Sequence, residues 1–68
     1  PANDILHIAA EEVISEVQIL DPLGRILHKE SPLSASSAIL MERFPGGIYL
    51  VQVSLQQGGQ RVYRAVKD

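Results

Sequence analysis

The chain has 68 residues, of which 46% are hydrophobic and 21% are charged, a length and composition that indicate one folded domain and argue against disorder. Its net charge of -2 at pH 7 excludes the basic surface that nucleic acid or an acidic membrane would need. The chain has no cysteine, which excludes disulfides and thiolate chemistry, and no hydrophobic run approaches the roughly 20 residues of a membrane helix.

The first stretch that favours a strand is residues 5–9, which is short and rich in β-forming side chains. Residues 10–14 carry two glutamates and are expected to form a loop. A second strand is predicted over residues 16–20, with Val17 and Ile19 facing inward. The hydrophobic side chains of residues 10–17 also match helical spacing, so a helix is the alternative for this segment.

Asp21-Pro22-Leu23-Gly24 is a turn sequence in which each residue has a physical role. Asp21 opens the turn, Pro22 fixes φ at the second position, and Gly24 supplies the conformation with φ > 0 that closes it. Because hydrophobic residues lie on both sides, the turn predicts a hairpin that pairs residues 17–20 with residues 25–30.

Residues 31–37 are small and polar and are expected to form a loop. Residues 38–41 are predicted to form a strand. A helical turn capped by Ser36 or Ser37 is the alternative.

The strongest strand signal follows a segment that interrupts regular structure. Pro45 has no N–H to donate, and Gly47 is expected to adopt φ > 0 as the chain turns into the strand. The strand is predicted over Ile48–Leu55 and is expected to be central, with its odd-numbered residues on one face and both faces buried at its start. Tyr49 is placed like a tyrosine corner, whose hydroxyl bonds an upstream backbone group, although plain core packing would also explain it.

A second hairpin is predicted across residues 56–59, with the chain returning over residues 60–67. Both faces of the returning strand carry charge, so an edge strand or a bulge is expected here. Six short strands and no convincing helix predict an all-β fold, a small antiparallel immunoglobulin-like β-sandwich of six to seven strands.

No residue pattern indicates an enzyme, a cofactor or a metal site. His7 and His28 lack the spacing of a zinc site. The serines of residues 31–37 have no base or oxyanion motif nearby, and Gly46-Gly47 lacks the Lys-Ser/Thr that follows in a phosphate loop. No catalytic, cofactor-binding or metal-binding residue is therefore predicted, and neither a small-molecule substrate nor nucleic acid is expected.

Four stretches, taken together in this order, resemble the C-terminal sorting domain of the type IX secretion system, the Por secretion tail family. They are Pro1-Ala2-Asn3-Asp4-Ile5-Leu6-His7-Ile8, Val17-Gln18-Ile19-Leu20-Asp21-Pro22-Leu23-Gly24-Arg25, Phe44-Pro45-Gly46-Gly47-Ile48-Tyr49-Leu50-Val51-Gln52-Val53 and Arg64-Ala65-Val66-Lys67. The resemblance spans essentially the whole chain and implies that residues 1–68 are a single sorting domain, expected to be excised from a larger secreted protein.

The resemblance implies a secretion signal. Such a domain follows its cargo in the parent chain, folds in the periplasm, and is recognised by the outer-membrane type IX translocon. A surface sortase then removes it, and the cut is expected before Pro1. The cargo reaches the cell surface or is secreted.

The last strand is the hypothesised recognition element, because a sheet edge can bind a partner by strand addition. Its candidate translocon-recognition residues are Arg61, Arg64, Val66 and Lys67. The candidate structural motif residues are Asp21, Gly24, Pro45, Gly47 and Tyr49. A monomer or a strand-swapped dimer is expected. The alternative function is an immunoglobulin-like adhesion or spacer module of a cell-surface protein.

Overall fold

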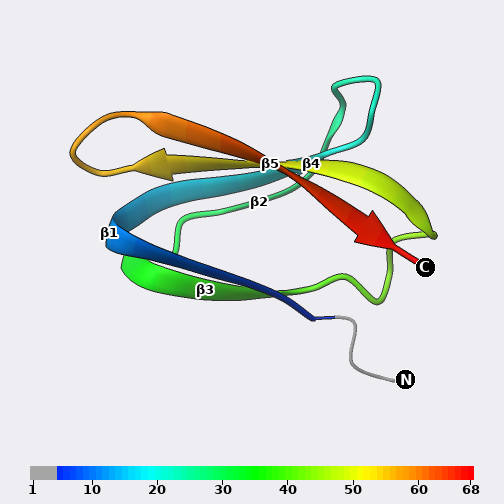
Figure 1. The fold of residues 1–68 in the computed structure, drawn as a ribbon, viewed down its shortest axis with the longest axis horizontal. Helices are drawn as coiled ribbons and strands as arrows, with labels where there is room; N and C mark the ends of the chain where they lie inside the picture. The colour runs from blue at the N-terminus through cyan, green and yellow to red at the C-terminus, as the bar shows by residue number, and fades with distance from the viewer. Residues whose placement is uncertain (1–4) are drawn as a thin grey trace.

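The computed structural model describes residues 5–68, and these form five strands connected by turns (Figure 1). The strands are β1 (Ile5–Leu20), β2 (Ile26–Glu30), β3 (Ser34–Leu40), β4 (Gly47–Leu55) and β5 (Gln60–Lys67). Every paired set of strands is antiparallel, which confirms the all-β antiparallel class. Within the described residues, no helix is both long and apolar enough to cross a membrane.

Strand β1 has 16 residues and connects the rest of the sheet. Its first part, residues 5–9, pairs with β3, whereas residues 14–20 pair with β4 and residues 17–20 with β2. The register is irregular between Ala9 and Ile14 and again between Ile14 and Glu16. Such irregularities bend a strand and redirect it, so β1 can serve both parts of the sheet.

This continuous strand corrects two sequence predictions. Residues 10–14 are neither the expected loop nor the alternative helix, because they remain extended while β1 exchanges one set of partners for another. The two strands predicted on either side are therefore the ends of one strand. The described residues contain five strands, so the predicted count of six to seven is not confirmed.

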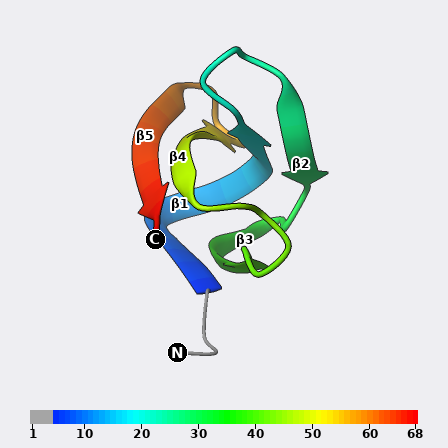
Figure 2. The ribbon, with the colours of Figure 1, turned by 90° about the vertical axis from the view of Figure 1, so that its right-hand side faces the viewer.

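The sheet has the order β2-β1-β4-β5, and β3 joins it through β1. All five strands belong to this one sheet, so a sandwich of two separate sheets is not confirmed. Viewed end-on, the sheet curls so that its strands surround the interior (Figure 2). Strand β5 pairs with β4 alone among the described residues, which confirms the predicted edge strand.

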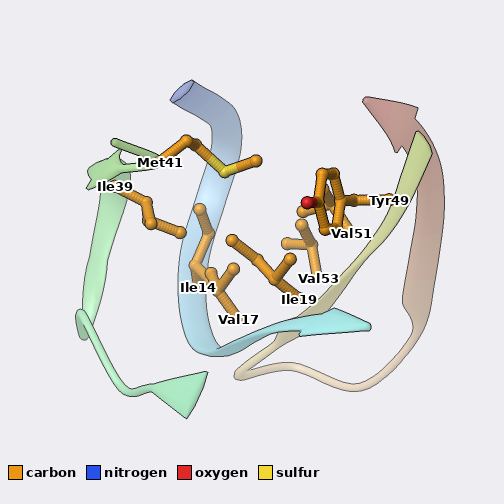
Figure 3. Packing of buried hydrophobic residues seen from close by; sticks show 8 residues of the cluster. All are labelled: Ile14, Val17, Ile19, Ile39, Met41, Tyr49, Val51 and Val53. Carbon is orange, nitrogen blue, oxygen red and sulfur yellow. The ribbon is translucent and has the colours of Figure 1, made fainter. Parts of the chain in front are cut away.

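The core lies inside this curled sheet. Figure 3 shows Ile39 and Met41 projecting toward side chains from β4, with side chains from β1 completing the cluster. Among residues 5–68, the buried hydrophobic residues of this core are Ile14, Val17, Ile19, Ile39, Met41, Tyr49, Val51 and Val53. Each such side chain contributes roughly 1.5–3 kcal/mol by its burial, so the loss of any one matters in a core this small.

The burial pattern confirms most of the predicted faces. Val17 and Ile19 are fully buried, and Tyr49, Val51 and Val53 share the inner face of β4. Ile48, however, is 47% exposed, so the expectation that both faces are buried at the start of this strand is wrong. Strand β4 pairs with β1 and β5 and is therefore central, as predicted.

The predicted turns are present at both hairpins. Residues 21–25 connect β1 to β2, and residues 56–59 connect β4 to β5 with φ of 104° at Gly58 and 95° at Gly59. Residues 38–40 belong to β3, which confirms the strand over the capped helical turn. Because β3 already begins at Ser34, the loop before it is shorter than expected.

Candidate functional site at the C-terminal clasp

The motif residues singled out in the sequence converge at one end of the molecule. A surface hollow there is lined by the turn after β1 and by the segment that enters β4. Asp21, Pro45, Gly47 and Tyr49 all line it. Two stretches far apart in the sequence, residues 21–27 and residues 45–49, therefore form one surface.

The turn after β1 is organised by the carboxylate of Asp21, which is 8% exposed. Its Oδ1 accepts hydrogen bonds from the backbone N–H of Leu23 at 3.0 Å and of Arg25 at 2.9 Å. Its Oδ2 accepts one from Nε of Arg25 at 2.7 Å. The N–H of Arg25, its guanidinium and the N–H of Leu23 all favour the ionised carboxylate and together lower the pKa of Asp21, against the opposing effect of burial.

Gly24 closes this turn as predicted. Its φ is 89°, a value that favours glycine, and its N–H donates to the carbonyl oxygen of Asp21 at 2.9 Å. The predicted hairpin follows, with Val17 opposite Glu30 and Leu20 opposite Ile26.

The end of β5 is fastened to the chain segment that leads into β4. The ammonium of Lys67 donates to the carbonyl oxygens of Met41 at 2.8 Å, Glu42 at 3.2 Å and Phe44. In the ladder, Lys67 lies opposite Gly47. We call residues 41–47 together with residues 67–68 the C-terminal clasp.

Three further contacts complete the C-terminal clasp. The hydroxyl of Tyr49 donates to the carbonyl oxygen of Pro45, as a tyrosine corner would, while its ring packs in the core and its centroid lies 5.5 Å from that of Phe44. A Cβ added at Gly46 would lie 3.1 Å from the backbone carbon of Asp68, so a larger residue there would require Asp68 to move by a few tenths of an ångström. Gly47 has φ of 152°, as predicted, and its constraint is conformational because nothing would contact an added Cβ.

The candidate recognition residues are divided between two regions. Val66 is 67% exposed and lies opposite Ile48, and Arg64 lies opposite Leu50, so both are on the outer face of β5 beside the C-terminal clasp. Arg61 lies opposite Val53, toward the other end of β5. The structure thus brings Val66 and Lys67 to the clasp and separates Arg61 from it.

Comparison with known proteins assigns the chain to a family. The family model described as "Secretion system C-terminal sorting domain", which belongs to type IX secretion, matches residues 1–67. The chain belongs to this family. No curated protein and no solved structure matched it.

As a type IX sorting domain, the chain is expected to interact with the secretion machinery and to direct export to the cell surface or the medium. The family is not known as enzymatic. Three of the four stretches that carried the resemblance include residues of the β1–β2 turn or the C-terminal clasp. Of the opening stretch, Pro1–Asp4 and the expected cut before them lie outside the described residues.

The surroundings of the two histidines do not resemble a metal site. His28 contacts the carboxylate of Glu30 at 2.9 Å, and the hydroxyl of Ser37 donates to the same carboxylate. These two partners lower the pKa of Glu30, the hydroxyl having the larger effect. His7 is exposed. Within residues 5–68, no three histidine or acidic side chains gather as a metal site would require.

Sequence reasoning missed two parts of the C-terminal clasp. The partners of Lys67 are backbone carbonyls 23 to 26 residues away, and nothing in the local sequence points to them. The role of Gly46 depends on the position of the chain end. The one available signal was the pair of adjacent glycines, of which only the second was assigned a reason.

Proposed function

We propose that residues 1–68 are the C-terminal sorting signal of a longer cargo protein and that the outer-membrane type IX translocon recognises them as a folded domain. The observation that carries this proposal is the family match over residues 1–67. The arrangement of the motifs supports it, because residues 21–25, 44–49 and 66–67 gather at one end of the fold, where one receptor could contact them together.

Recognition in this proposal involves the outer face of β5 and the clasp beside it. Val66 and Arg64 present exposed side chains there and are suited to direct contact. Lys67 acts by holding the clasp in place, since its ammonium donates to clasp carbonyls. Arg61 contributes a separate contact nearer the far end of the strand.

The remaining steps follow the same proposal. The domain folds in the periplasm as an immunoglobulin-like unit, remains a monomer or forms a strand-swapped dimer, and carries no catalytic activity of its own. A surface sortase removes it once the cargo has crossed the outer membrane. The alternative is a permanent adhesion or spacer module, which would stay attached to its parent protein.

The test is an export assay. Residues 1–68 are fused to the C-terminus of a periplasmic reporter and expressed in a strain with a working type IX system and in a matched strain without its translocon. We expect the reporter at the surface or in the medium only in the first strain. Retention of a folded reporter in the periplasm of both strains would contradict the proposal and favour the adhesion or spacer module.

A further inference from the structure

The outer face of the curled sheet carries hydrophobic side chains at the end nearest the C-terminal clasp. On β1 and β4, Leu20 and Leu50 alternate with buried residues and therefore point away from the core. Leu20 lies opposite Leu50 on one side and opposite Ile26 on the other, so three adjacent strands contribute to one row. Arg64 of β5 lies opposite Leu50 and ends this row.

A second, shorter row lies between the first row and the clasp, where Ile48 is opposite Val66. Ile26, Ile48 and Val66 are 54%, 47% and 67% exposed, so large parts of these side chains contact solvent. We call the two rows together the outer band, and its residues are Leu20, Ile26, Ile48, Leu50, Arg64 and Val66.

The outer band departs from the usual composition of an antiparallel sheet that has one face packed on a core. Such a sheet places hydrophobic side chains inward and polar side chains outward. The rows farther from the clasp follow this rule, with Val62 as the exception, and their other residues are Glu16, Gln18, Lys29, Gln52 and Ser54. A contiguous exposed hydrophobic patch typically marks an interaction site. The outer band is therefore a candidate interface.

Arg64 specifies what would cover the outer band. Within residues 5–68, no carboxylate forms an ion pair with its guanidinium, and its neighbours in the band are hydrophobic. A charge that is removed from water without a partner is costly, whereas a guanidinium pairs well with a carboxylate through two parallel hydrogen bonds. A surface that covers the band should therefore be hydrophobic and present a carboxylate to Arg64.

Charge argues against a second copy of this chain and against a membrane. Glu16, the carboxylate on the same face, already accepts a hydrogen bond from Gln18 at 2.9 Å and lies 3.6 Å from the ammonium of Lys29. Two copies packed band to band would thus cover two Arg64 side chains with no free carboxylate between them. One arginine in a chain of net charge -2 is also too little for an anionic lipid surface, which attracts clusters of basic residues.

We propose that the outer band packs face to face on a hydrophobic protein surface of the secretion machinery that presents a carboxylate to Arg64. This inference rests on the proposed sorting function and extends the recognition surface from β5 across β4 and β1 to β2. The outer face is the convex side of the curled sheet (Figure 2), and packing on it leaves the free edge of β5 unpaired. It therefore differs from strand addition.

The first test removes hydrophobic side chains from β2 and β4, which strand addition to β5 would not contact. Ile26→Thr with Ile48→Thr is made in the reporter fusion and compared with the natural domain, in strains with and without the translocon. We expect export to fall severalfold. Ile5→Thr with Leu40→Thr is the matched control, because these residues are exposed, lie opposite each other and are outside the outer band. Its export should be normal.

The second test addresses the carboxylate. Arg64→Leu makes the outer band more hydrophobic, so it would preserve export if hydrophobic contact alone were required. We expect export to fall severalfold, because the carboxylate of the partner would be buried without its guanidinium. Arg64→Lys should restore part of the loss. Melting curves establish that each variant is folded, and if the double threonine variant is not, the exposed Arg64 variants decide.

The outcomes separate this proposal from the sorting function. Normal export of the folded Ile26→Thr, Ile48→Thr variant or of Arg64→Leu would overturn the outer band alone, since the natural domain would still direct export. Failure of the natural domain to direct export would overturn both. Self-association of the isolated chain, or its binding to phosphatidylglycerol vesicles, that the double threonine substitution abolishes would make a second copy or a lipid surface the occupant and would also overturn the proposal.

Discussion

Lys67 is the residue at which recognition and folding are hardest to separate. Its ammonium donates to the carbonyl oxygens of Met41, Glu42 and Phe44, and hydrogen bonds from a charged group contribute roughly 1.5–3 kcal/mol. We therefore expect Lys67→Met to lower the free energy of unfolding by about 1–2 kcal/mol, allowing for partial exposure. The exposed Arg64→Met is the matched control and should change it by less than about 0.5 kcal/mol. Equal melting temperatures for the two variants would contradict this role of Lys67.

Gly47 is constrained by its backbone alone. Its φ of 152° lies where side chains are rarely found, although an added Cβ would meet no neighbour. Gly47→Val should therefore destabilise the domain by more than the roughly 1 kcal/mol of an average substitution. Thermal melting measures this, with Ala35→Val on exposed β3 as the control. An unchanged melting temperature for Gly47→Val would show that the turn can be rebuilt without glycine.

Asp21 should make stability depend on pH. Its pKa in the folded state is lowered from 3.8, chiefly by the N–H of Arg25. A group with a lowered pKa stabilises the fold fully above its unfolded pKa, and this contribution is lost as pH falls through the folded pKa. The advantage of the natural chain over Asp21→Asn should therefore be constant near neutral pH and shrink below about 3.8. Melting curves over that range test this, and parallel pH profiles would contradict it.

The two faces of strand β5 have different roles, one in packing and the other in recognition. Ala65 packs against the core, and Lys67 reaches the clasp, whereas Arg64 and Val66 lie on the outer face. Arg64→Glu with Val66→Thr should keep the free energy of unfolding within about 1 kcal/mol. The same pair should reduce export of the fused reporter severalfold. Leu40→Thr, at a similarly exposed position of β3, is the control and should leave export normal.

The elements predicted well were those whose cause lies within a few residues. The turn at residues 21–24 follows from a carboxylate, a proline and a glycine in fixed order, and the central strand follows from alternation after Pro45. Continuity of β1 could not be predicted, because it depends on pairing with residues distant in sequence on either side of residues 10–13, of Ala9 with Ser36 and of Ile14 with Ser34 and Leu55. The two glutamates of residues 10–14 favoured a loop, and the helical spacing of their hydrophobic side chains favoured a helix.

For the molecule as a whole, the candidate site was likewise predictable only where its cause lies within a few residues. The sequence located Asp21, Pro45, Gly47 and Tyr49 as separate motifs, and the fold brings them to one surface. The sequence also indicated that the last strand lies at an edge of the sheet, since charge lies on both of its faces. The structure gives that strand eight ladder pairs with β4 and an anchored end, so its contribution to folding is larger than its composition suggests.

Because β5 contributes to folding, deleting its end should destabilise the domain. Deleting residues 64–68 removes the ladder pairs of residues 47–50, the packing of Ala65 and the ammonium that holds the clasp. A domain of this length is stable by only about 3–10 kcal/mol. We therefore expect the truncated chain to be largely unfolded at physiological temperature and to show no cooperative melting transition. Removal of Asp68 alone should change the melting temperature little. Retention of near-natural stability by the truncated chain would show that β5 is a detachable strand, and loss of export on truncation would then report recognition directly.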